Sequence, residues 1–165
     1  MNLAELAEQL RSGQITIGPW EASMRDYLRS NYEAAMTLVK GGRDNITQSD
    51  WGYEGSLLKK QYAYLNNFAK DIQSNPDAWS NKRLDTRMNL YKESAYAAME
   101  DMQRRNMEQN GYTQERRVLA QVDNCDDCIE YAGMGWQPIG TLPAIGDSVC
   151  ITNCKCEFEY GKEEG

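Results

Sequence analysis

The sequence predicts a mainly α-helical protein: an extended body of three long helices, followed by a small irregular module that a metal ion holds together. Apolar residues recur at spacings of three and four over most of the first 111 residues. All five cysteines lie between positions 125 and 156, in a stretch rich in Gly and Pro. We therefore expect a helical body over residues 1–111 and a Cys-rich metal-binding module with short β-strands over residues 112–165.

The first part of the body is predicted to hold a short helix and a long one. Apolar positions over residues 3–10 form one amphipathic face, and Gly13 follows as a stop. Pro19 suits the first position of the next helix. Its apolar stripe continues to Val39 and ends at Gly41 and Gly42.

Two further long helices are predicted after this glycine pair. Thr47 or Ser49 is the expected cap of one whose apolar positions run over residues 53–72, before Asn75 and Pro76 end it. The other has its apolar positions over residues 84–102. We expect it to fade through the polar residues 104–110 and to end at Gly111.

Ten tyrosines accompany only two phenylalanines in this chain. Tyr combines apolar area with a polar tip, so it suits a surface that a neighbour half buries. It also suits the edge of an ordinary core, and the sequence leaves both interpretations open.

The character of the chain changes after Gly111. Residues 118–122 are apolar and short, which indicates a strand that leads to Cys125. The turn-forming residues of positions 133–146 exclude regular structure there, and residues 157–160 alternate as a closing strand would. We expect Trp136 and Leu142 to cover the metal site.

The cysteine spacing indicates a structural zinc site. Cys125 and Cys128 are two residues apart, as in a metal knuckle, and Cys150, Cys154 and Cys156 form a second group. Tetrahedral Zn²⁺ takes four thiolate ligands, commonly as two pairs from separate turns. Four of these five cysteines are the expected ligands, and the sequence leaves open which of Cys150, Cys154 and Cys156 is spare.

Other uses of the cysteines fit less well. The number is odd and no secretory leader precedes them, which disfavours a disulfide framework. A redox Cys-x-x-Cys needs a low thiol pKa, whereas Asp123, Asp126 and Asp127 make a thiolate harder to form. Inert reduced cysteines remain a further alternative.

Composition narrows the classes of function. The chain has no histidine, which removes the usual general base and the Ser-His and Cys-His nucleophile pairs. No phosphate-binding glycine loop is present, and a metal held by four cysteines has no open position for substrate. We therefore expect a protein that is not an enzyme, with no catalytic or cofactor-binding residues beyond the structural Zn²⁺.

The charge distribution argues against a nucleic-acid reader. The net charge is −7, and residues 112–165 hold 4 basic and 10 acidic residues, which leaves −1 for the rest. A metal module that reads DNA normally carries the opposite sign. Apolar runs are too short for a membrane span, so we expect a soluble protein made in a reducing cytoplasm.

The order of motifs in the C-terminal part resembles a known family. It comprises Cys-Asp-Asp-Cys at 125–128, Gly-Trp-Gln-Pro-Ile-Gly-Thr-Leu-Pro at 135–143, Gly-Asp at 146–147 and Asn-Cys-Lys-Cys at 153–156. This order resembles the C-terminal module of tailed-phage minor head proteins, the head morphogenesis family. Residues 61–69 and 91–96 are also similar to the helical part of such proteins. Many members have His-Pro before the last motif, where this chain has Ile151 and Thr152 after Cys150.

The resemblance implies a non-enzymatic virion component of a bacteriophage head, made in the host cytoplasm. Such a protein assists capsid assembly or DNA delivery, inside the procapsid or beside the portal. Its expected partners are the major capsid protein, the portal protein or further copies of itself, bound through the helices.

Two alternative functions belong to other classes. One is an intracellular, zinc-stabilised adaptor that binds a regulatory partner, with no particle involved. The other is a thiol oxidoreductase that cycles a disulfide between Cys125 and Cys128.

Overall fold

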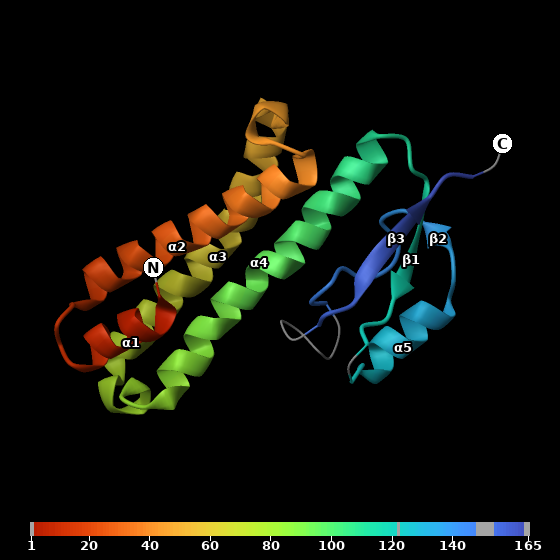
Figure 1. The fold of residues 1–165 in the computed structure, drawn as a ribbon. Helices are drawn as coiled ribbons and strands as arrows, with labels where there is room; N and C mark the ends of the chain where they lie inside the picture. The colour runs from red at the N-terminus through yellow and green to blue at the C-terminus, as the bar shows by residue number, and fades with distance from the viewer. Residues whose placement is uncertain (1, 122, 148–153, 164–165) are drawn as a thin grey trace.

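The computed structural model of the chain describes residues 2–121, 123–147 and 154–163. Four α-helices form the N-terminal part, and a three-stranded antiparallel sheet with one short helix forms the C-terminal part (Figure 1). We call the first part, up to Gly111, the helical body and the rest the C-terminal module. This arrangement confirms the predicted fold class.

The two N-terminal helices begin and end close to their predicted positions. α1 (Leu3–Arg11) is capped by the side chain of Asn2, which accepts a hydrogen bond from the Ala4 N–H. α2 (Ile17–Lys40) begins two residues before Pro19, so the prediction that Pro19 is its first residue is wrong. α2 ends at Gly41, whose φ of 71° is a left-handed conformation that favours glycine.

α3 (Gln48–Ser74) begins with a capping box. The Thr47 side chain accepts from the Asp50 N–H, while the Asp50 carboxylate accepts from the Thr47 N–H. Thr47 is therefore the cap, rather than Ser49. Asn75 ends the helix as predicted, and Pro76 begins a short 3₁₀ turn (Pro76–Trp79).

α4 (Lys82–Gln109) ends within two residues of its predicted end at Gly111, but it does not fade before that point. The sequence suggested that it would fade after residue 103, yet it continues unbroken to Gln109. Two consecutive arginines explain the difference, because Arg104 pairs with Glu115 of the C-terminal module and Arg105 pairs with Asp50 of α3. The polar character of this segment reflects buried ion pairs and not a disordered end.

The core of the helical body lies where α2 meets α3 and α4. Trp20 is fully buried and contacts Phe68 edge to face at 5.7 Å, and Phe68 stacks with Tyr91 at 6.2 Å. Burying a side chain of this size contributes roughly 1.5–3 kcal/mol. Within α2–α4, most residues of the predicted apolar stripes are buried or half-buried, but Leu38 at the end of the α2 stripe is 74% exposed.

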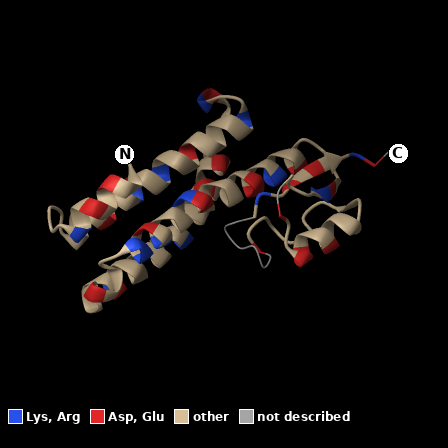
Figure 2. Cartoon of the chain, turned by 60° about the horizontal axis from the view of Figure 1, so that its bottom comes forward, with Lys and Arg blue, Asp and Glu red and all other residues tan. Residues whose placement is uncertain are grey.

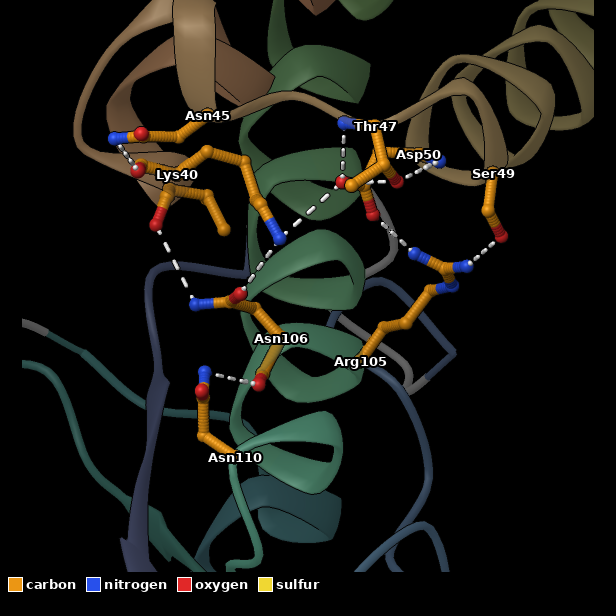
Figure 3. Close-up of polar contacts among 9 residues, drawn as sticks. Lys40, Asn45, Thr47, Ser49, Asp50, Arg105, Asn106 and Asn110 are labelled. Carbon is orange, nitrogen blue, oxygen red and sulfur yellow. Dashed lines mark hydrogen bonds and ion pairs between the residues drawn. The ribbon is translucent and has the colours of Figure 1, made fainter.

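A polar network fixes the turn between α2 and α3 to the end of α4 (Figure 3). Asp50 is 2% exposed, and its carboxylate lies 3.2 Å from Lys40 Nζ and 2.5 Å from Arg105 Nη1. Arg105 also donates to the Ser49 hydroxyl at 2.8 Å. Burial raises the pKa of Asp50, but the Thr47, Arg105 and Lys40 hydrogen bonds outweigh it and hold this pKa well below its usual value.

The C-terminal module is built on a sheet in the order β2-β1-β3. β1 (Gln114–Val118) pairs antiparallel with β2 (Gln137–Pro138) and, over its whole length, with β3 (Glu157–Gly161). α5 (Asp126–Gly133) lies against β1. In Figure 1 the sheet and α5 lie beside the second half of α4, on the side away from α2 and α3.

The module also departs from the predictions. The first strand covers residues 114–118 rather than 118–122, because Glu115 and Arg117 are buried and so mask the expected apolar alternation. α5 was not predicted, and the two residues of β2 lie in the stretch where regular structure had been excluded. The closing strand at residues 157–160 is confirmed.

No helix among the described residues is both long and apolar enough to cross a membrane. The charges follow the sequence pattern: basic and acidic residues are mixed along the helices of the body, whereas α5 carries only acidic ones (Figure 2).

Candidate metal centre

The strand register brings two distant cysteine segments together. Val118 at the end of β1 pairs with Glu157 at the start of β3. Residues just before β3 therefore lie beside the chain that leaves β1 toward α5, which starts after Cys125. Cys154 and Cys156 belong to the residues just before β3, and Cys128 belongs to α5.

Three buried sulfurs meet at this point. The Sγ atoms of Cys128, Cys154 and Cys156 all lie within 4.8 Å of one another, and those of Cys128 and Cys154 are 3.6 Å apart. Two thiolates bound to one tetrahedral Zn²⁺ at about 2.3 Å would have sulfurs about 3.8 Å apart. A disulfide has its sulfurs about 2.05 Å apart, so Cys128 and Cys154 are not joined. The spacing thus fits shared coordination of one ion.

Hydrogen bonds at Cys154 favour the thiolate form that a metal needs. Burial raises the pKa of Cys154, but the Cys156 N–H, the Cys128 side chain and the Gly146 N–H all favour the ionised sulfur and leave the pKa below its usual value. Backbone donors of this kind are the usual partners of a zinc-bound thiolate. The chemistry and the spacing of the three residues therefore fit Zn²⁺, which cysteine thiolates prefer over hard cations such as Mg²⁺.

Asn124 positions the third sulfur. Its side chain bridges Ala120, donating to the carbonyl at 3.0 Å and accepting from the N–H at 3.2 Å. Its amide oxygen lies 3.4 Å from the Sγ of Cys156. Asn124 thus links the loop after β1 to the cysteine segment that precedes β3.

An apolar shell with two arginines surrounds the sulfurs. Leu142, Ile145 and Phe158 are buried against the cysteines. The guanidinium groups of Arg104 and Arg117 lie 4.2 and 4.7 Å from the centre of the Phe158 ring. Such stacking stabilises a cation near an aromatic face by about 0.5–2 kcal/mol.

Glu115 ties this shell to the helical body. It is fully buried, accepts from the Leu142 N–H at 3.0 Å, and lies 3.0 Å from Arg104 Nε of α4. Arg117 donates to the carbonyl of Pro143. The glycine- and proline-rich loop is therefore held by two buried charged residues of β1.

The predicted ligands divide into three groups. Cys128, Cys154 and Cys156 are brought together, as expected. Cys125 is the N-cap residue of α5 and packs against the cluster half-buried, outside the group of three among the described residues. Cys150 lies outside the described residues. The sequence left the spare residue among Cys150, Cys154 and Cys156, whereas the cluster includes Cys154 and Cys156, so the choice of fourth ligand now lies between Cys125 and Cys150.

Of the two residues expected to cover the site, one does so. Leu142 is buried in the shell. Trp136 is 43% exposed and lies between Arg116, 4.7 Å from its ring, and the backbone of Gly161. The expectation for Trp136 is wrong, because the strand pairing places it over β1 and β3 rather than over the sulfurs.

Sequence reasoning missed the residues of α4 that reach this site. The Tyr96 hydroxyl donates to the Cys156 carbonyl at 2.8 Å, and Arg104 Nη2 donates to the Leu142 carbonyl at 3.0 Å. Tyr96 and Arg104 are eight residues apart, which places them on one side of α4. A pair of polar residues at this spacing is one local sign in the sequence that this side of the helix contacts another part of the chain.

Comparison with protein-family models, with curated proteins and with solved structures finds no match to this chain. The fold and the cysteine geometry therefore carry the argument about function, together with the residue pattern itself.

Proposed function

We propose that this chain is a non-enzymatic structural protein of a tailed-phage head, of the minor head type, with a structural zinc module. Its helices would bind the major capsid protein or the portal protein, in several copies per particle. The observation that carries the proposal is the meeting of Cys128, Cys154 and Cys156, because these residues belong to the two motifs on which the family resemblance rests.

A structural role for the metal is supported by the burial of its ligands. All three cysteines are at most 2% exposed, and Leu142, Ile145 and Phe158 close the space around them. A catalytic zinc needs an open coordination position that water or substrate can reach. A closed cysteine site instead contributes folding free energy to a module too small to fold on apolar burial alone.

The helical body supplies surface for protein partners. Leu38 and Tyr64 are large apolar residues that remain 74% and 55% exposed on α2 and α3. Tyr is common in the centres of protein interfaces, where its ring is buried and its hydroxyl is hydrogen-bonded. The C-terminal module also exposes large apolar residues, among them Ile129 on α5, so both parts offer apolar surface to capsid or portal.

The test is co-assembly. The full chain is produced together with the capsid and portal proteins of the same phage, and the assembled heads are separated on a density gradient. We expect the chain to sediment with the heads at a low, fixed ratio to the capsid protein. If heads form and the chain stays with the soluble fraction, the virion proposal is wrong and the zinc-stabilised adaptor becomes the better hypothesis.

One observation favours the oxidoreductase alternative. Cys125 stands at the N-terminus of α5, a position that lowers thiol pKa values in redox Cys-x-x-Cys motifs. However, Cys128 is fully buried and its sulfur lies against Cys154. Reversible formation of a Cys125–Cys128 disulfide, with turnover of a thiol substrate, would support this alternative against the structural one.

A further inference from the structure

One face of α4 carries the contact between the helical body and the cysteine segment. Its residues are spaced by three or four positions, so they lie in one row along the helix. The row consists of Glu93, Tyr96, Glu100 and Arg104. Their partners, in the same order, are the Lys155 ammonium, the Cys156 carbonyl, the Phe158 N–H and the Leu142 carbonyl.

The Tyr96 contact reaches the metal site most directly. Its hydroxyl donates to the carbonyl of Cys156 at 2.8 Å, and the ammonium of Lys155 lies 5.5 Å from the centre of its ring. Cys156 is one of the three clustered cysteines. The hydroxyl of Tyr96 therefore fixes the backbone of a metal ligand from an element outside the module.

Residues 144–147 form a second connection between the cysteine cluster and the helical body. Ile145 of this loop is buried in one apolar cluster with Cys154 and Cys156. Residues 144–147 also form one wall of a cavity of about 370 Å³ between α3 and α4. The opposite walls include Lys60 and Tyr64 of α3 and Ala98 of α4.

The same loop faces charged residues of both helices across this cavity. Asp147 of the loop, Asp101 of α4 and Lys60 of α3 all line it. A shift of the loop would therefore change the surroundings of α3 as well as those of α4.

We propose that metal binding at the cysteine cluster is coupled to the conformation of the helical body, with Tyr96 and Ile145 as the positioning residues that transmit it. The inference rests on the structural zinc of the proposed function. A bound ion fixes Cys154 and Cys156, and these in turn fix the 144–147 loop and the second half of α4. Coupling of this kind is reciprocal, so a change in the α4 residues that contact the cysteine segment must alter metal affinity to the same extent.

The size of the effect follows from the type of contact. Residues that hydrogen-bond to metal ligands, rather than to the metal, typically change affinity by about 10- to 100-fold when they are substituted. Tyr96→Phe removes one hydroxyl and keeps the ring. We expect it to weaken zinc binding by about 10-fold.

Two measurements on the full chain test the coupling. The first is zinc affinity, measured by competition with a chromogenic chelator for the wild type, Tyr96→Phe and Tyr62→Phe. Tyr62 is the matched control, because its ring lies under Arg25 on the side of α2, away from the module. We expect a loss of about 10-fold for Tyr96→Phe and no change for Tyr62→Phe. Equal affinities for all three proteins would overturn the proposal.

The second measurement is hydrogen exchange of the wild type with zinc and after chelation. We expect faster exchange without zinc in residues 93–104 of α4, and unchanged exchange in residues 20–36 of α2. Zinc that binds while exchange in α4 stays the same would refute the coupling and leave the zinc site intact. Failure of the wild type to bind zinc at all would refute both.

Discussion

The helical body and the C-terminal module differ in the kind of residue that they bury. The body buries Trp20, Phe68 and Leu84 in a core that extends over four helices. In the described part of the module, half of the buried apolar residues are cysteines, and Glu115 and Arg117 are buried beside them. Apolar area thus stabilises the body, whereas in our proposal metal binding and buried polar contacts stabilise the module.

The largest expected difference between the two parts is their response to metal removal. Chelation, or Cys154→Ser, should abolish the protection of amide protons in β1 and β3, because a structural zinc site can contribute roughly 10 kcal/mol or more. Far-ultraviolet circular dichroism should keep most of its helical signal. Strands that stay protected in the chelated protein would contradict the comparison.

The zinc content of single Cys→Ser variants identifies the fourth ligand. Cys128→Ser, Cys154→Ser and Cys156→Ser should each lose zinc, since all three sulfurs belong to the cluster. Of Cys125→Ser and Cys150→Ser, one should lose zinc and the other should retain it. Retention of zinc by Cys128→Ser would show that the cluster is not the site.

A core substitution should affect the body and spare the metal site. Trp20 is fully buried, so Trp20→Ala should lower the free energy of unfolding by about 3–5 kcal/mol. The zinc content of the folded protein should not change. Trp136→Ala is the control, because Trp136 is 43% exposed and its removal should cost much less. Chemical denaturation followed by circular dichroism measures both.

The contribution of Asp50 to the free energy of unfolding of the body depends on pH. Its pKa lies below the unfolded value, so ionised Asp50 stabilises the fold above about pH 4 and this contribution is lost as the pH falls. Asp50→Asn should cost roughly 3 kcal/mol at pH 7, at the lower end for a buried pair because Lys40 and Arg105 are partly exposed. The difference between the wild type and the variant should be full above about pH 4 and should shrink progressively as the pH falls below that value. A difference that is independent of pH would exclude the ion pairs as its cause.

Glu100, at the junction of body and module, should show the opposite dependence. Burial raises its pKa to about 7, although the Phe158 N–H and Arg117 favour the ionised form. The folded state therefore binds more protons than the unfolded state between about pH 4.5 and pH 7, and the contribution of Glu100 to stability falls over this range.

Glu100→Gln keeps an acceptor for the Phe158 N–H and removes the charge. We expect the variant to gain on the order of 1–2 kcal/mol over the wild type at pH 8, and little at pH 4.5. Glu108→Gln, on the exposed side of the same helix, should show no such change with pH. Thermal unfolding at the two pH values measures the difference in stability. An equal effect at both would contradict the claim that Glu100 is protonated in the folded state.

The body was largely predictable, because its burial follows local periodicity. The stripe from Trp20 to Val39 specified α2, and Thr47 with Asp50 specified the start of α3. The end of α4 was not predictable in this way, since Arg104 and Arg105 look solvated until Glu115 and Asp50 are placed beside them.

The candidate site was predictable in its chemistry and less so in its geometry. Cysteine spacing alone indicated a metal, and three of the expected ligands do meet. The expected knuckle turn is instead the start of α5, and Tyr96 reaches Cys156 from 60 residues away. Contacts of this range depend on how the body and the module pack, which no local pattern encodes.

The most direct test of this account is the zinc content of the purified full chain, measured by elemental analysis together with a count of reactive thiols. We expect close to one zinc per chain, with four of the five thiols protected until a chelator is added. Absence of zinc together with five freely reacting thiols would contradict the claim that a metal holds the C-terminal module.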